Sequence, residues 1–293
     1  MKYANMHLHT VHSDGVLTPY ELCAKAKELG FGALSITDHH TVSGWKSFEA
    51  AAKQVGIDYI LGLEGNGKAD GHNFHIVAYH FDPTAPAMAE YLKNEEDSAM
   101  ALTEARFKAC IAEGAFEGIT WQDVLDNSPE RCWICNEQVF ATLVKLTDWE
   151  QKDYWRFVRS FNTKKVEYKK TNRAYSAKEF IKIIRDAGGI ASLAHPHNQT
   201  QCLPELFSYG LNCVEYDHPD INEFDSKEAY KFAKEHNMYV SGGTDHTGKL
   251  SNYPHLRGNP SSLGSSFLTP LDADVRNGIT KEEFLDLKNR TKE

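Results

Sequence analysis

Histidine residues are concentrated at the start of the sequence, where eight of the fourteen lie within the first 80 positions. Two of them, His7 and His9, are two residues apart in a stretch that predicts a short strand over residues 3–9. Side chains at this spacing project from the same face of a strand, so both imidazoles can bind one ion. Asp14 follows in the next predicted loop. Imidazole and carboxylate groups together are typical ligands of divalent transition metals, and this stretch therefore predicts a metal site.

Six more residues of these two types stand in or directly after other predicted strands, over 32–37, 57–63, 73–81, 190–194 and 238–241. Any one of them could be an ordinary hydrogen-bonded loop residue. Packing gives no reason, however, for so many strands to end in imidazoles and carboxylates, so we predict a site for several ions. The candidate ligands are His7, His9, Asp14, His39, Glu64, His75, His195, Asp245 and His246. Asp38, next to His39, is the carboxylate expected to hold a ligand histidine by its other ring nitrogen.

Helix signals alternate with these strands. Thr18 and Glu21 form a capping box around Pro19, and Ser176 and Glu179 form a second one. Further helices are predicted over 42–55 and 223–236, and a further strand over 212–216. Strands that alternate with helices of this length indicate βαβ units around a parallel sheet or barrel, in which the carboxyl ends of the strands face one site.

Residues 87–175 interrupt this alternation with a helical pattern and no strand signal. We therefore predict a helical insertion or cap over 87–175, and a metal-binding barrel made of residues 1–86 and 176–293. One basic run borders the return to the barrel, with lysines at 164, 165, 169 and 170 followed by Arg173. A solvated surface explains most such runs, but arginine is a usual clamp for phosphate, and Arg173 is the candidate substrate-binding residue.

Composition excludes several classes of protein. The 293 residues carry 32 basic and 41 acidic side chains, a net charge of -9 that disfavours binding to bulk nucleic acid. No run of about 18 apolar residues predicts a membrane span, and the first residues do not resemble a signal peptide. Six cysteines are too few for a disulfide framework, which favours the cytoplasm as the location. Nothing in the sequence predicts the oligomeric state.

Several motifs resemble those of the polymerase and histidinol phosphatase (PHP) family. Its first motif is similar to His7-Leu8-His9-Thr10-Val11-His12-Ser13-Asp14-Gly15, and its second to Ile36-Thr37-Asp38-His39. Its later motifs are similar, in order, to Gly62-Leu63-Glu64, the strand at His75, Leu193-Ala194-His195-Pro196 and Gly243-Thr244-Asp245-His246. There are two departures: the family usually ends in Asp-x-His, and the Arg-Pro-His motif of one phosphatase branch is replaced here by Trp133-Ile134-Cys135-Asn136.

The resemblance implies a distorted (β/α)7 TIM-like barrel with an inserted helical cap, holding two to three divalent ions. It implies one ion on His7, His9, Glu64 and Asp245, a second on Glu64, His75 and His195, and a third on Asp14, His39 and His246. A shared carboxylate can hold two ions about 3.5–4 Å apart, which suits attack on a phosphate ester. The ligand types fit Mn²⁺, Zn²⁺ or Fe²⁺ and do not choose among them.

The first hypothesis is a metal-dependent phosphoesterase in which a metal-activated hydroxide attacks a small phosphorylated metabolite or nucleotide. The ester would be a monoester such as a nucleoside 3',5'-bisphosphate, or a cyclic phosphate or diester, and Glu64, Asp245 and His246 would be the catalytic residues. A second hypothesis is an amidohydrolase-type enzyme acting on C–N or C–O bonds, although a bridging glutamate counts against it. A third is a non-catalytic metal-binding module, as PHP-like domains can be when attached to polymerases.

Overall fold

The computed structural model describes residues 2–15, 17–128, 133–245 and 277–289. Its strands are β1 Ala4–Asn5, β2 Ala33–Ile36, β3 Asp58–Ala69, β4 His72–Tyr79, β5 Ile190–Leu193, β6 Cys213–Asp217 and β7 Tyr239–Gly242. Its helices are α1 Pro19–Glu28, α2 Trp45–Val55, α3 Pro86–Ala112, α4 Trp121–Asp126, α5 Asn136–Leu146, α6 Tyr154–Asn162, α7 Ala177–Asp186, α8 Leu203–Ser208, α9 Glu223–Glu235 and α12 Lys281–Asn289. Two short 3₁₀ helices, η1 Gln151–Asp153 and η2 Thr200–Cys202, precede α6 and α8.

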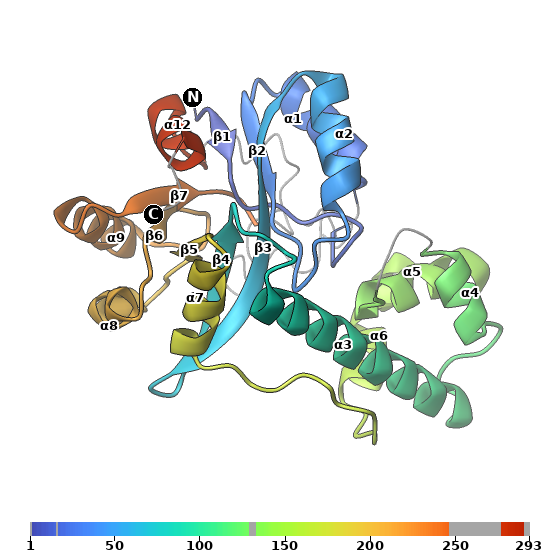
Figure 1. Ribbon diagram of the computed structural model, residues 1–293. Coiled ribbons are helices and arrows are strands. Elements are labelled where there is room, and N and C mark those ends of the chain that lie inside the picture. The colour runs from blue at the N-terminus through green and yellow to red at the C-terminus, as the bar shows by residue number, and fades with distance from the viewer. Residues whose placement is uncertain (1, 16, 129–132, 246–276, 290–293) are drawn as a thin grey trace.

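The seven strands form one sheet in chain order, and its two edges come together (Figure 1). The N–H of Met6, just after β1, donates to the carbonyl of Gly242 at the end of β7, at 3.0 Å. The N–H of Asp245 donates to the carbonyl of His7 at 2.9 Å. These bonds close the sheet into a barrel with helices outside it, so the predicted distorted (β/α)7 barrel with inserted helices is confirmed.

The expectation that all strands run parallel is wrong for β4, which is antiparallel to both β3 and β5. The cause is a tight hairpin at Asp70 and Gly71, where both residues have positive φ, of 44° and 80°. Positive φ at both central residues is the geometry of a two-residue hairpin turn, and an Asp-Gly pair is a sequence signal for it. The same hairpin extends β3 to Ala69, so Glu64 lies in the middle of a strand and not at its end.

The predicted strand over 3–9 is also shorter, because β1 ends at Asn5. Beyond that point the chain bonds alternately to its two neighbours: Met6 bonds to β7, as above, and the Leu8 carbonyl accepts from the Thr37 N–H at 2.8 Å. Alternate residues therefore still face the same way, and His7 and His9 keep the common orientation that their spacing predicts.

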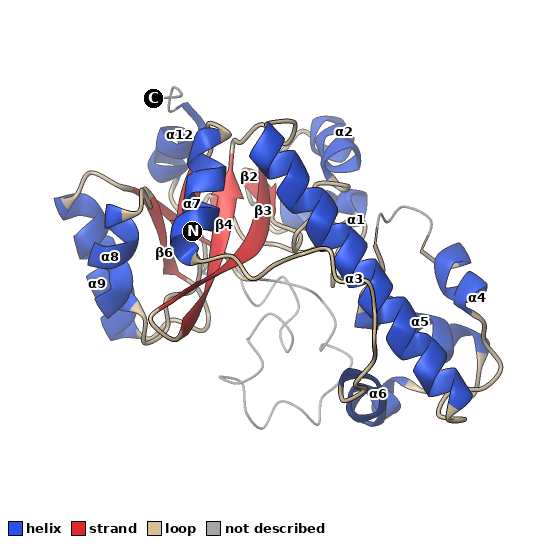
Figure 2. Cartoon of the chain, turned by 60° about the horizontal axis from the view of Figure 1, so that its bottom comes forward, coloured by secondary structure: helices blue, strands red, loops and turns tan. Residues whose placement is uncertain are grey.

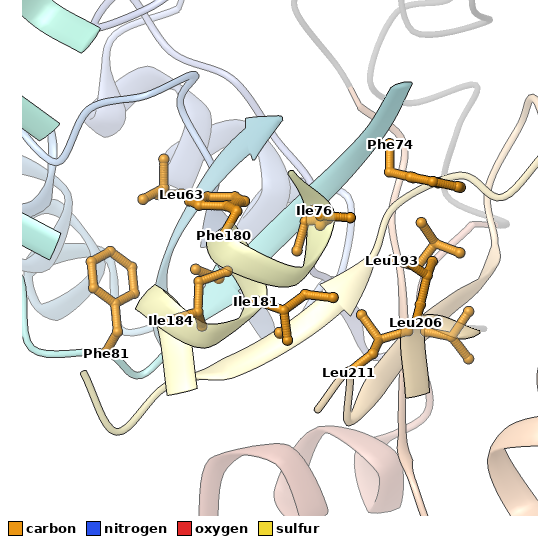
Figure 3. Packing of buried hydrophobic residues seen from close by; sticks show 14 of the residues in the cluster. Leu63, Phe74, Ile76, Phe81, Phe180, Ile181, Ile184, Leu193, Leu206 and Leu211 are labelled. Atoms are coloured by element: carbon orange, nitrogen blue, oxygen red, sulfur yellow. The ribbon is translucent and has the colours of Figure 1, made fainter. Parts of the chain in front are cut away.

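Local helix signals act as predicted. Both capping boxes form, at Thr18 with Glu21 and at Ser176 with Glu179. The buried face of α7 then packs across the outside of the sheet, where Phe180, Ile181 and Ile184 lie over side chains of β3, β4 and β5 (Figure 3). Burial of such apolar faces holds the helices against the barrel.

The chain between β4 and α7 leaves the barrel along α3 and forms a lobe with α4, α5 and α6 (Figure 1). This lobe has its own apolar cluster, which includes Phe107, Phe116 and Phe157, whereas Met88 and Tyr91 at the start of α3 pack in the barrel cluster. An extended stretch over 163–175 then runs back beside α3 to α7 (Figure 2). The lobe corresponds to the predicted insertion over 87–175, although the domain boundaries themselves remain a prediction.

Among the helices that the structure describes, none combines the length and the apolar character needed to cross a bilayer.

Candidate metal centre

Eight of the nine predicted ligands converge at the end of the barrel where β1, β2, β5 and β7 have their carboxyl termini. They form overlapping groups whose ligand atoms lie within 4.8 Å of one another. The eight are His7, His9, Asp14, His39, Glu64, His75, His195 and Asp245. The ninth, His246, lies outside the described residues.

The first group consists of His7, His9, Glu64 and Asp245. The Nε2 atoms of His7 and His9 each lie 3.4 Å from Glu64 Oε2. Asp245 Oδ1 is 2.8 Å from His9 Nε2 and 3.7 Å from His7 Nε2. Two imidazole nitrogens and two carboxylate oxygens thus face a common point.

The second group shares Glu64 and adds His75 and His195. Glu64 Oε1 is 2.8 Å from His75 Nδ1 and 3.3 Å from His195 Nε2. The carboxylate therefore presents Oε2 to the first group and Oε1 to the second. Because only 1% of its side chain is exposed, Glu64 is fixed between the two groups.

A third group lies on the other side of His9. Asp14 Oδ1 is 3.5 Å from His9 Nδ1 and 3.9 Å from His39 Nε2. The other ring nitrogen of His39, Nδ1, is 3.1 Å from Glu64 Oε2. Asp14 and His39 are thus brought together as the resemblance implies, with His9 beside them.

The electrostatics of the cluster favour added positive charge. Burial lowers the pKa of His9, but the contact with Asp245 and the charges of Asp14 and Glu64 outweigh it and raise the pKa to about 9. Burial raises the pKa of Glu64, but His75, His7 and His39 outweigh it and hold the pKa well below the usual range. Buried carboxylates that stabilise a proton on neighbouring imidazoles stabilise a divalent cation in the same place.

The donor atoms themselves fit such an ion. His7 Nε2, His9 Nε2 and Glu64 Oε2 are buried and, among the described residues, have no hydrogen-bond partner of acceptable geometry. Buried polar atoms are normally satisfied, so three that face one point call for a bound group. Nitrogen and oxygen ligands in this mixture suit Mn²⁺, Zn²⁺ or Fe²⁺.

Two of the candidate ligands have an unusual backbone. His195 and Asp245 have φ values of 25° and 51°, in the region that side chains other than glycine rarely adopt. Such conformations cost free energy and persist where the surrounding structure holds them, often at functional sites. Here they occur just after β5 and β7, where the side chain must turn into the barrel mouth.

Glu215 on β6 is a site residue that the sequence did not reveal. Its side chain is buried, and its Oε2 lies 3.2 Å from His7 Nδ1 and accepts the backbone N–H of His195 at 2.8 Å. His218, just after β6, completes a buried group with His7 and Glu215. The available signal was an acidic residue between the apolar residues Val214 and Tyr216 of a predicted strand.

Asp38 has a different role from the one expected. It does not hold a ligand histidine; its carboxylate accepts the N–H of Thr10 at 2.8 Å, the hydroxyl of Thr10 at 2.7 Å and the hydroxyl of Ser13 at 2.6 Å. These bonds fix the loop that carries Asp14. The carboxylate that orients a ligand histidine is Glu215. The Nδ1 atom of His7 faces Glu215, while the Nε2 atom of the same ring faces Glu64.

The inserted lobe also contacts the loops of the centre. Gln138 Nε2 on α5 donates to the Ser13 carbonyl at 2.8 Å, and the Cys135 thiol donates to the same carbonyl at 3.2 Å. Tyr91 on α3 lies 2.6 Å from His40 Nδ1. The insertion is therefore built onto the rim of the site.

Arg173 does not enter the ligand cluster. It lies on the exposed stretch before α7, where it pairs with Glu179 at 2.9 Å and lies over the Tyr175 ring at 4.3 Å. It does line a pocket that also includes His40. Its predicted role in substrate binding remains a prediction.

The fold and the cluster together define the class of protein: a TIM-like barrel with a multi-histidine, multi-carboxylate centre of the metal-binding kind at its strand ends. Within that class, the PHP domain model matches residues 5–205. The chain belongs to the PHP domain family.

Curated relatives cover most of the chain. A 5'-3' exoribonuclease of Haemophilus influenzae is 29% identical over 255 residues, which span 83% of this chain and 89% of the relative. A 3',5'-nucleoside bisphosphate phosphatase of Chromobacterium violaceum is 27% identical, over 84% of this chain and 87% of its own length. A phosphoribosyl 1,2-cyclic phosphate 1,2-diphosphodiesterase of Eggerthella lenta is 23% identical, over 86% and 97%.

Solved structures agree on the fold. A protein of Bifidobacterium adolescentis described as a metal-dependent phosphoesterase superposes with a TM-score of 0.75 at 23% identity, over 98% of this chain and 95% of the other. An amidohydrolase of Chromobacterium violaceum, with bound sulfate, superposes with a TM-score of 0.63 at 25% identity, over 84% and 87%.

Proposed function

We propose that the protein is a metal-dependent phosphoesterase, a hydrolase of phosphoric esters. The observation that carries the proposal is the position of Glu64, a buried carboxylate with one oxygen facing each of two ligand groups. A carboxylate shared in this way is suited to two ions a few ångströms apart, the arrangement that favours in-line displacement at phosphorus. The names of the relatives, which are hydrolases of phosphate esters, support the same reaction class.

The candidate ligands fall into three groups, one for each proposed ion. His7, His9, Glu64 and Asp245 would hold one ion, Glu64, His75 and His195 a second, and Asp14, His39 and His246 a third. When bound, such ions lower the pKa of water and neutralise charge on the phosphoryl oxygens. Asp245 is 26% exposed, whereas the imidazoles of His7 and His9 and the Glu64 carboxylate, which it contacts or lies beside, are buried. Its carboxylate therefore faces the open side and is placed to accept the proton of the attacking water.

The substrate is a small phosphorylated metabolite or nucleotide. The relatives are named for a nucleoside bisphosphate, a cyclic sugar phosphate and an RNA chain, so the end of an RNA belongs among the substrates to be tried. Net charge of -9 favours a small ligand or a chain end over an extended nucleic acid.

The test is hydrolysis by purified protein loaded with Mn²⁺, Zn²⁺ or Fe²⁺, followed by chromatographic separation of the products, because only a monoester releases inorganic phosphate. Substrates are a nucleoside 3',5'-bisphosphate, a cyclic ribose phosphate, a 5'-phosphorylated oligoribonucleotide, an amide and a lactone. We expect phosphate ester hydrolysis with two to three ions per chain by elemental analysis. Glu64→Gln should lower kcat by about 10³-fold or more, because it removes the anionic bridge that places both ions.

Glu28→Gln is the matched control, because Glu28 is 72% exposed on α1 and pairs only with Lys25 among the described residues. A Glu64→Gln variant with near-normal turnover would contradict the proposal. Hydrolysis of the amide or the lactone alone would indicate an amidohydrolase, and bound metal without any turnover would indicate a non-catalytic module.

A further inference from the structure

Ser13 is held from two sides, by the barrel and by the inserted lobe. Its hydroxyl donates to Asp38, just after β2 of the barrel, at 2.6 Å. Its carbonyl accepts from Nε2 of Gln138, on α5 of the lobe, at 2.8 Å. These last two residues are 125 positions apart in the sequence, and the proposed reaction assigns their contact no role.

The carbonyl of Ser13 is directly connected to a candidate ligand. A planar peptide bond joins it to the N–H of Asp14, so a fixed carbonyl restricts the two dihedral angles beside that bond, ψ of Ser13 and φ of Asp14. These angles place the Asp14 carboxylate, whose Oδ1 lies 3.5 Å from His9 Nδ1 and 3.9 Å from His39 Nε2. The contact with the lobe therefore acts on the third ligand group.

The side chain of Gln138 is buried and is bonded at both ends. Its Oε1 accepts the N–H of Cys135, at the start of α5, at 2.8 Å. An amide has one acceptor end and one donor end, so this bond leaves the donor end facing the Ser13 carbonyl. The Cys135 thiol also lies 3.2 Å from that carbonyl, but it is a weak donor with one hydrogen and lies 3.0 Å from Glu137 Oε2 as well. Gln138 is therefore the stronger of the two donors.

The start of α5 does not by itself require a glutamine. Gln138 is the third residue of the helix, a position where glutamate and glutamine both serve in a capping box. A glutamate there would still accept the Cys135 N–H, but its second oxygen would face the Ser13 carbonyl with no hydrogen to donate. Only the amide satisfies both partners, so the residue type points to the contact with the barrel loop.

The remainder of α5 belongs to the lobe. Val139, Phe140 and Leu143 are buried in the apolar cluster that also contains Phe107 and Phe157. Close packing of this kind fixes the helix within the lobe. The position of the lobe on the barrel therefore determines where the Gln138 amide lies.

We propose that Gln138 is a positioning residue for the ion of Asp14 and His39. By donating to the Ser13 carbonyl, it holds the Asp14 carboxylate where that carboxylate can bind the ion. The inference rests on the metal centre of the proposed function, and it makes the inserted lobe a part of that centre.

The experiment measures ions per chain by elemental analysis and metal affinity by competition with a chelator. In Gln138→Glu, which keeps the cap of α5, the ion that is lost in Asp14→Asn should bind about tenfold or more weakly, the usual effect of losing a contact that supports a ligand. Gln138→Met should have the same effect without burying a charge, because the two variants share only the loss of the donor to Ser13.

Gln122→Glu is the matched control. Gln122 is exposed on α4 of the same lobe, where its amide donates to Asp126 at 2.7 Å. This variant should bind every ion as the wild type does. Circular dichroism of the metal-free proteins should show that all the variants are folded.

A double-mutant cycle tests whether Gln138 acts through Asp14. Asp14→Asn/Gln138→Glu should bind metal no more weakly than Asp14→Asn alone, because residues that act as a unit are not additive. Wild-type affinity in both Gln138 variants, or additive losses in the double variant, would overturn the inference.

Bound metal is measured without turnover, so the outcome is separate from that of the proposed reaction. If phosphate esters are hydrolysed but no ion depends on Asp14 and Gln138, the inference fails and the phosphoesterase proposal stands. If the two residues are coupled in metal binding but no ester is hydrolysed, the phosphoesterase proposal fails and the role of Gln138 stands.

Discussion

Glu215 lies behind the ligand cluster and contacts two of its members from different strands. An ionised carboxylate only accepts hydrogen bonds, so the Nδ1 atom of His7 donates a proton to Glu215, and the Nε2 atom would offer its electron pair to a bound ion. The same oxygen accepts the N–H of His195, whose backbone has a φ of 25°. Glu215 thus fixes the ring state of one ligand and the strained backbone of another.

Glu215→Gln should therefore weaken metal binding by about 10–100-fold while the protein stays folded, because a neutral amide no longer holds the His7 ring in one state. Competition with a chelator of known affinity measures the effect, and circular dichroism checks the fold. Glu28→Gln should bind metal as the wild type does. Equal affinity in Glu215→Gln would show that His7 is oriented by other contacts.

At the scale of elements, helix α7 begins with the capping box of Ser176 and Glu179, and the stability that this box contributes should depend on pH. The Glu179 carboxylate accepts the N–H and the hydroxyl of Ser176 and pairs with Arg173, and these contacts lower its pKa to about 2. A glutamate with a lowered pKa in the folded state stabilises the protein above its ordinary pKa of about 4.3. That contribution declines as pH falls toward about 2.

Glu179→Gln should consequently lower the free energy of unfolding at neutral pH by about 0.5 kcal/mol, a small value because the group is largely exposed and screened by water. The difference from wild type should stay nearly constant from pH 7 to about 5, and should narrow as pH falls from about 5 toward about 2, because the unfolded chain binds the proton in this range and the folded chain does not. Urea unfolding of metal-free protein at each pH measures it. A constant difference across this range would mean that the carboxylate charge has no part in the cap.

The whole molecule combines a barrel whose mouth is lined by charged groups with a lobe that has a separate apolar core. The apolar clusters of the barrel and of the lobe consist of hydrophobic side chains and include none of the ligand residues, so they do not need an ion to form. The ligand groups, by contrast, join residues of β3, β4 and the segments after β1, β2, β5 and β7. A bound ion would therefore link several strands at one end of the barrel, but the hydrophobic core can form without it.

Removal of metal by a chelator should leave the protein folded but lower its Tm by about 5–15 °C, the shift expected for ligands present at about 10²–10³ times their Kd. Calorimetry with and without chelator measures the shift, and added Mn²⁺ should restore it. In Glu64→Gln the shift should be much smaller. A wild-type Tm that does not respond to the chelator would argue against bound metal.

Most of the ligand set follows from the sequence alone, because it depends on short-range rules. The spacing of His7 and His9, the positions of His39 and His195 after strands, and the capping boxes at Thr18 and Ser176 all involve residues within a turn or a strand of one another. Such patterns determine local structure whatever the rest of the chain does.

Tertiary structure decided the features that join distant segments. The antiparallel direction of β4 depends on how its hairpin pairs with β5, more than 100 residues later in the sequence, although the Asp70-Gly71 turn gave a local hint. The contact of Glu215 with His7 spans 208 positions, and the contact of Gln138 with Ser13 spans 125. Composition and periodicity cannot place such pairs, because their distance is set by closure of the barrel and burial of its helices.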